Sequence, residues 1–178
     1  MSISWQADRT KRIAVDALLI ALSMMLSYLE VLLPLTAWIP LPGFRLGLAN
    51  VAVMAVFFLL SPVDAAIISG TRILLMGLLF GSVTSLYFSA LGGICAFLCM
   101  LLIAKWGSRM SFLGASVLSA AAHNAGQILA AVTLFGTSLI ASYLPILLIA
   151  SVVFGGAVGL LLNLLAPRLS AVLKGGHR

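Results

Sequence analysis

Six apolar segments, separated by short polar stretches or turn-forming residues, run along almost the whole chain. Each segment approaches the roughly 20 residues that a helix needs to cross about 30 Å of hydrocarbon. The pattern predicts an all-α, polytopic membrane protein that forms a single transmembrane domain over residues 1–178. The six expected spans are residues 12–33, 46–60, 63–80, 84–103, 112–135 and 140–165.

Turn-forming residues mark the boundaries of the first three segments. Pro40, Pro42 and Gly43 forbid regular helix between the first two. The second segment is short for a full span. Ser61 and Pro62 then fit the N-cap and first turn of a new helix, and Asp64 suits the positive end of its dipole.

Composition excludes a soluble domain. Hydrophobic residues make up 63% of the chain and charged residues only 8%, whereas a soluble domain has about 25% charged residues. Of the ten cations, eight precede the first segment, separate the fourth from the fifth, or follow the last: Arg9, Lys11, Arg12, Lys105, Arg109, Arg168, Lys174 and Arg178. The positive-inside rule therefore predicts that both termini are cytoplasmic. We expect a multi-pass protein, surrounded by lipid, in a bacterial cytoplasmic membrane. The cations form no patch with interleaved aromatics, which argues against a nucleic-acid partner.

Cysteines and small residues recur at helical spacing. Cys95 and Cys99 share one helix face, and we interpret them as packing residues rather than a redox pair. Small pairs that let membrane helices approach closely are Ala17/Ala21, Gly77/Gly81 and Gly155/Gly159. We expect the glycine pairs to serve internal packing and the alanine pair to face an external partner.

Arg72 lies inside an apolar run from Ile67 to Met76. A guanidinium is not deprotonated in proteins. Placing it at the centre of a spanning helix costs about 2.5–3.5 kcal/mol on insertion scales, so such a residue faces a protein interior or a wet cavity. Arg72 is therefore a candidate functional residue.

Other polar residues lie in or beside the apolar segments. The candidates for solute binding, together with Arg72, are Glu30, Arg45, Asn50, His123, Asn124 and Gln127. On a functional interpretation they line one outward-facing pocket whose charge favours an anionic or mixed polar solute. Aromatic residues that would supply a pocket wall or lid are Tyr28, Trp38, Phe44 and Tyr87.

A purely structural interpretation of the same residues stays open. Glu30 would then pair with Arg45 or Arg72, and the amides would join helices. Hydrogen bonds of that kind contribute about 0.6 kcal/mol each in membrane proteins.

Several chemistries lack their sequence signatures. The three lysines, Lys11, Lys105 and Lys174, stand outside any phosphate-cradling Gly-x-x-x-x-Gly-Lys-Ser/Thr pattern. The aspartates Asp8, Asp16 and Asp64 are isolated, so they do not form the clusters that hold Mg²⁺ on a diphosphate. We therefore expect no enzyme activity, no cofactor and no metal site.

Four blocks of sequence carry a family resemblance. They are Leu29-Glu30, the segment from Pro42 to Asn50, Leu91-Gly92-Gly93 with Arg72 upstream, and the segment from Ala122 to Gln127. Across nearly the whole chain the sequence resembles the Gx transporter family, also labelled heptaprenyl diphosphate synthase component I. That family is similar to the substrate-binding (S) subunits of energy-coupling-factor (ECF) transporters.

The resemblance implies a six-helix bundle with a pocket near the outer face. A first-helix Ala-x-x-x-Ala motif, matched here by Ala17 and Ala21, would contact a membrane T component, and two ATPase subunits would drive the cycle. The expected function is uptake of a small vitamin-like or precursor solute. The synthase label implies the alternative, a non-catalytic membrane accessory of a prenyltransferase in isoprenoid synthesis. A third interpretation is a solitary carrier or a structural membrane protein.

Overall fold

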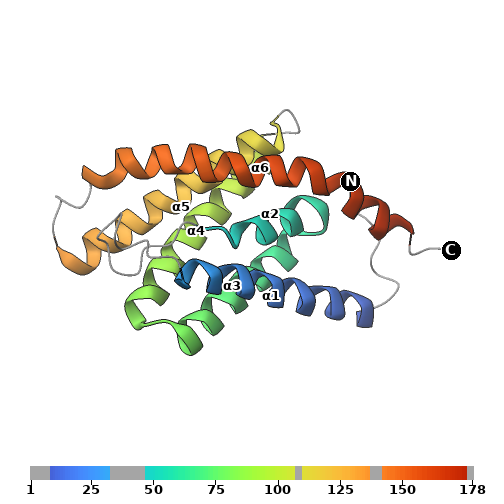
Figure 1. Cartoon of the computed structure of the whole chain (residues 1–178), viewed down its shortest axis with the longest axis horizontal. Helices are drawn as coiled ribbons and strands as arrows, with labels where there is room; N and C mark the ends of the chain where they lie inside the picture. Colours follow the sequence, from blue (N-terminus) through green and yellow to red (C-terminus); the bar gives the residue numbers. More distant parts are fainter. Residues whose placement is uncertain (1–8, 33–46, 107–109, 137–141, 176–178) are drawn as a thin grey trace.

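The computed structural model describes residues 9–32, 47–106, 110–136 and 142–175. Within these ranges the chain forms six α-helices and no strand (Figure 1). They are α1 (Arg9–Leu32), α2 (Asn50–Leu59), α3 (Pro62–Phe80), α4 (Val83–Lys105), α5 (Phe112–Phe135) and α6 (Leu144–Gly175). The all-α prediction and the order of the six helices are confirmed.

Five of the helices are long and apolar enough to cross a membrane, so the chain is a multi-pass membrane protein. The exception is α2, whose 10 residues rise only about 15 Å, half of the hydrocarbon thickness. The sequence placed the start of this helix at residue 46, whereas the helix begins at Asn50 because residues 47–49 form a turn. Of the six expected spans, five correspond to helices of spanning length and composition, while the number of spans and the cytoplasmic placement of the termini stay predictions.

Serine side chains begin three of the helices. The hydroxyl of Ser61 accepts from Val63 N at 3.1 Å, and Pro62 occupies the first turn of α3, as predicted. Ser82 and Ser111 cap α4 and α5 in the same way. Each serine satisfies a first-turn amide that has no partner inside its helix.

The last helix is longer than its apolar segment. The sequence placed this span at residues 140–165, but α6 runs from Leu144 to Gly175 and carries Pro167 inside it. A proline removes one backbone hydrogen bond without forbidding the helix on either side. The helix end predicted from hydropathy alone is therefore too early in the sequence.

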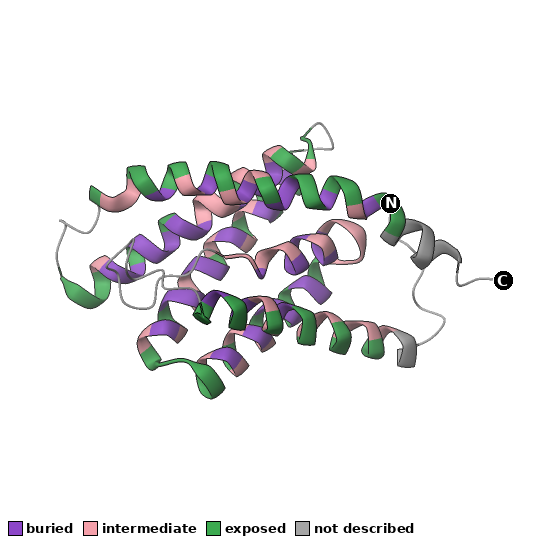
Figure 2. Ribbon diagram, in the orientation of Figure 1, coloured by how far each residue is buried: buried purple, intermediate pink, exposed green. Residues whose placement is uncertain are grey.

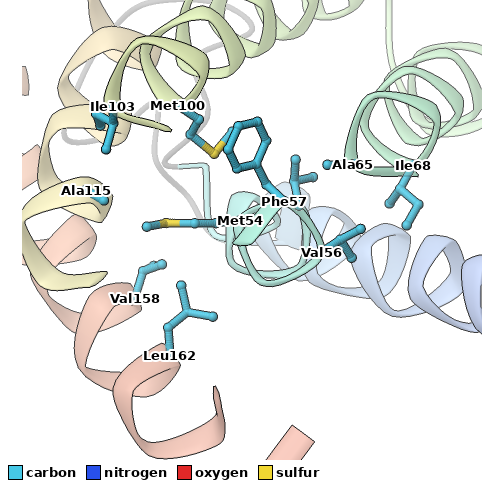
Figure 3. Packing of buried hydrophobic residues seen from close by; sticks show 11 residues of the cluster. Met54, Val56, Phe57, Ala65, Ile68, Met100, Ile103, Ala115, Val158 and Leu162 are labelled. Carbon is cyan, nitrogen blue, oxygen red and sulfur yellow. The ribbon is translucent and has the colours of Figure 1, made fainter. Parts of the chain in front are cut away.

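The short helix α2 lies in the middle of the bundle. It packs against α3, α6 and α1, and in Figure 1 it lies between α1 on one side and α6 on the other. Buried residues concentrate on the inward faces of the surrounding helices, while their outer faces are exposed (Figure 2). The main apolar cluster is built around Met54, Val56 and Phe57 of α2 (Figure 3).

Gly77, Gly155 and Gly159 serve packing between helices, as predicted. A Cβ added to Gly159 of α6 would meet Leu113 Cα at 2.5 Å, and one added to Gly155 would meet Val117 Cα at 2.9 Å. A Cβ on Gly77 of α3 would meet the Leu86 side chain at 2.5 Å. These contacts bring α6 onto α5 and α3 onto α4.

Candidate functional site

Arg72 of α3 is the centre of a buried polar network. Only 5% of the residue is exposed. Its Nη1 donates to Ser27 Oγ of α1 at 3.0 Å, and its Nη2 donates to Asn50 Oδ1 of α2 at 3.4 Å. The guanidinium thus joins three helices, and it faces the protein interior as the sequence predicted.

The network continues from Asn50 into α5. Asn50 Nδ2 lies 3.3 Å from His123 Nδ1, and the amide of Gln127 lies 2.8 Å from His123 Nε2. Arg72 only donates, so the Asn50 oxygen faces it and the Asn50 amide hydrogen faces His123 Nδ1. A neutral imidazole has one N–H and one acceptor nitrogen, so the donor and acceptor at each ring nitrogen depend on the tautomer of His123.

Glu30 of α1 contacts the turn that precedes α2. Its side chain is buried, and Oε1 accepts from the backbone N–H of Leu48. Asn50 N and Val51 N close the turn on Gly47 O and Leu48 O at 2.9 and 3.0 Å. A carboxylate at this position suits the positive end of the α2 dipole.

Gly47 allows that turn to form. Its φ of 82° lies in the left-handed region, which residues with a side chain rarely adopt. A Cβ here would also lie 3.1 Å from Asn50 Nδ2. The backbone therefore passes close to the network only because residue 47 is glycine.

The start of α2 lies level with the middle of α3, one of the helices long and apolar enough to span a membrane. Arg72 lies ten residues after Pro62, roughly 15 Å along α3, and Asn50 hydrogen-bonds to it at that level. Non-helical backbone at such depth is tolerated only where protein covers it or where it lines a water-filled cavity. The turn at residues 47–49 and the buried Glu30 fit this condition.

Gly92 of α4 provides the space for the His123 ring. A Cβ at residue 92 would lie 2.8 Å from His123 Cε1 and 2.9 Å from Nδ1. The Gln127 Cγ atom would be 3.1 Å away. Sequence reasoning noted the Gly92-Gly93 pair but missed this role.

Asn124 is turned away from the network. Its Nδ2 donates to Leu147 O at 2.9 Å and to Ser151 Oγ at 2.8 Å, both on α6. The structure therefore brings Glu30, Asn50, Arg72, His123 and Gln127 into one region and places Asn124 at the α5–α6 contact.

The predicted aromatic wall is only partly described. Tyr28 is exposed and packs on Phe80 with ring centroids 5.0 Å apart. Tyr87 is also exposed, and its hydroxyl lies 3.2 Å from Thr133 Oγ1. Both lie at the surface of the bundle, while Trp38, Phe44 and Arg45 fall outside the described residues.

The α1 face that carries Ala17 and Ala21 is open. Both alanines are exposed, and so is Leu18 beside them. Nothing in the described bundle covers this face, and its docking role stays a prediction.

Two features of α1 were missed from the sequence. Ser23, Ser27 and Glu30 follow one another at helical spacing and are all buried, a polar stripe that the sequence does show. Nearer the start of α1, Arg12 Nη2 and Nε donate to Asp64 Oδ1 at 2.5 and 3.1 Å. Asp64 therefore pairs with α1 as well as standing in the first turn of α3.

Among the described residues no group of three or more His, Cys, Asp or Glu side chains is placed to hold a metal ion.

A comparison with known protein families identifies the family of this chain. The sequence model described as heptaprenyl diphosphate synthase component I matches residues 19–165, more than half of the chain. The chain belongs to this family. The match confirms the family resemblance found in the sequence. It covers every residue of the network, from Ser27 to Gln127. No curated protein and no solved structure shows a significant match to the chain.

Proposed function

We propose that this member of the heptaprenyl diphosphate synthase component I family is the solute-binding membrane subunit of an ECF-type transporter. It takes up a small vitamin-like or precursor solute of anionic or mixed polar character from the outer face. It performs no chemistry itself, and a T component with two ATPase subunits supplies the energy. The observation that carries the proposal is the hydrogen-bonded series Ser27, Arg72, Asn50, His123 and Gln127, which joins four helices.

A buried guanidinium is a costly means of joining helices. Burying Arg72 at the centre of a span costs about 2.5–3.5 kcal/mol on insertion scales. Hydrogen bonds in a membrane protein average about 0.6 kcal/mol, so about four to six of them are needed to offset that cost. Apolar side chains would join the helices at lower cost, which supports a function for the guanidinium.

The network suits a solute with a negative group. A guanidinium presents paired donors that match a carboxylate or a phosphate. Glu30 lies near the same turn of backbone and favours a positive or hydrogen-bond-donating group on the same solute. The His123–Gln127 pair adds further hydrogen-bonding groups.

The exposed face of α1 supports the proposal that a separate module supplies the energy. Ala17 and Ala21 leave a shallow, exposed surface on which another membrane helix can approach closely. The sequence has no phosphate-cradling loop of its own.

Native mass spectrometry of the protein purified from its host membrane tests the binding role. The native chain should carry a small-molecule adduct, and Arg72→Ala should reduce its occupancy at least about tenfold, or 1.4 kcal/mol. Arg72→Lys keeps the positive charge but loses the paired donors of the guanidinium. It therefore tests solute binding in a protein whose buried charge is unchanged. Arg168→Ala, at an exposed position of α6, is the matched control. Full occupancy in a folded Arg72→Ala protein would refute the proposal.

Docking is tested by affinity purification from the host. Ala17→Trp should remove the co-purifying ATPase module, because an indole would block close approach to α1. Ala157→Trp changes an exposed alanine of α6 and should leave that module in place. Equal recovery with both variants would argue against docking at α1.

The family description supports a second candidate, a non-catalytic membrane accessory of a prenyl diphosphate synthase. This alternative predicts that a soluble prenyltransferase co-purifies and loses activity when the chain is deleted. Co-purification of an ATPase module without a prenyltransferase supports transport instead.

A further inference from the structure

The polar stripe on α5 extends beyond the network. Ser116, Ser119, His123 and Gln127 occupy one side of the helix, spaced by three or four residues, and all four are buried. His123 and Gln127 already belong to the network. The two serines continue the stripe by about two turns toward the start of α5.

A small cavity lies beside these serines. It has a volume of ≈ 20 Å³ and lies between α2, α5 and α6, partly open to its surroundings. Its lining includes Asn50, Met54, Ser116, Ser119, Phe154 and Gly155. A cavity needs about 10–15 Å³ of this measure to hold one water, so there is room for a single oxygen-sized group.

The serine hydroxyls need a partner in that cavity. Ser116 and Ser119 are 3% and 4% exposed, and neither hydroxyl makes a hydrogen bond to another residue in the part of the chain that is described. Burying a hydroxyl without a hydrogen bond is costly, so buried hydroxyls are normally paired with protein or with ordered water. Both serines line the cavity, and Asn50 is the third described lining residue with a polar side chain.

The lining also decides the class of occupant. Among the residues that the structure describes, no charged side chain lines the cavity. A cation is disfavoured because the positive end of α2 opens at Asn50, which Arg72 also contacts. Hydroxyls and an amide both donate and accept, and three such groups match the two to four partners that a buried water requires.

Resting on the proposed function, we infer that Asn50, Ser116 and Ser119 form the inner end of the solute chamber and bind one uncharged oxygen. In the empty protein that oxygen belongs to a water molecule. In the loaded protein it belongs to a hydroxyl or carbonyl group of the solute, which displaces the water. The solute therefore has two recognised parts, a charged group at Arg72 and an uncharged oxygen beyond Asn50.

Hydroxyl-radical footprinting by X-ray radiolysis tests the water, because radicals form at bound water and oxidise adjacent methionines. Met54 lines the cavity, whereas Met100 is equally buried in the same apolar cluster but does not line it (Figure 3). Met54 should be oxidised several-fold faster than Met100. In the Ser116→Ala, Ser119→Ala double variant the two rates should become similar. Equal rates in the native protein, or no change in the variant, would overturn the assignment.

The solute part is tested with the small-molecule fraction of the host cell as the probe. Loading is followed as added mass by native mass spectrometry. In the loaded protein, the rate at which Met54 is oxidised should fall to the rate at which Met100 is oxidised. An unchanged Met54 rate in loaded protein would overturn displacement by the solute. That failure is distinct from failure of the transport proposal, which would appear as full loading of Arg72→Ala.

Discussion

Replacing Gly92 by Ala tests the geometry at the centre of the site. The added methyl would lie 2.8 Å from His123 Cε1 and 2.9 Å from Nδ1, closer than such atoms approach in real structures. The imidazole must therefore move. Because His123 Nδ1 lies only 3.3 Å from Asn50 Nδ2, the movement breaks the link between α5 and α2.

The magnitude follows from three contributions. Overpacking a tight core costs about 1–3 kcal/mol. The lost hydrogen bond adds about 0.6 kcal/mol. Alanine gains up to about 1 kcal/mol over glycine inside a helix. We expect Gly92→Ala to lower the free energy of unfolding by about 1–2 kcal/mol.

Gly70→Ala is the matched control. Gly70 is also inside a helix, but a Cβ there has no atom within 4 Å. Only the propensity gain remains, so this variant should be as stable as the native protein or more stable by up to about 1 kcal/mol. Steric trapping in mixed micelles measures both free energies of unfolding.

A double-mutant cycle tests whether contact with the His123 ring causes the loss of stability in Gly92→Ala. In a His123→Ala background the ring is absent, so Gly92→Ala should lose most of its penalty. If Gly92→Ala is as stable as Gly70→Ala, or if its penalty persists without the His123 ring, the proposed close approach is wrong.

Three further changes probe contacts outside the network. Asp64→Asn removes the charge that pairs with Arg12, so it should lower the melting temperature, and exchanging the residues as Arg12→Asp with Asp64→Arg should restore part of the loss. Asn124→Ala should lower the free energy of unfolding by about 1 kcal/mol by removing two bonds to α6, without reducing solute occupancy. Reduced occupancy in that variant would place Asn124 in the binding site. Ser61→Ala should cost about 1 kcal/mol through loss of the N-cap of α3, and unchanged unfolding would show that the cap contributes nothing.

Some site residues were predictable because burial of polar groups in a membrane is exceptional. Arg72 stood out in an apolar run, and its guanidinium proves to join α3 to α1 and α2 in the network. His123 and Gln127 lie four residues apart, so their contact followed from helical geometry alone. Ser27 did not stand out, because serine is ordinary in membrane helices and only its spacing from Ser23 and Glu30 indicates a buried face.

Asn124 and Asp64 show the limit of this reasoning. Asn124 neighbours His123 in sequence but projects about 100° away around the helix, and so it meets α6 instead. Asp64 fits a first-turn position, yet its side chain also reaches Arg12, fifty-two residues earlier. Local patterns indicated what these residues are suited to and left their partners open.

The sequence by itself determined the membrane class, the six helices and most of their limits. The reason is that hydrocarbon requires every backbone polar group to be satisfied within its own helix, so hydropathy and length decide the elements. Only the tertiary structure decided that α2 starts level with the middle of α3 and which polar groups meet there. Arg72 reaches Ser27 across 45 residues, and Asn50 reaches His123 across 73. Such partners depend on how each helix is rotated and on where glycine lets two backbones approach, and the periodicity of a single helix contains neither.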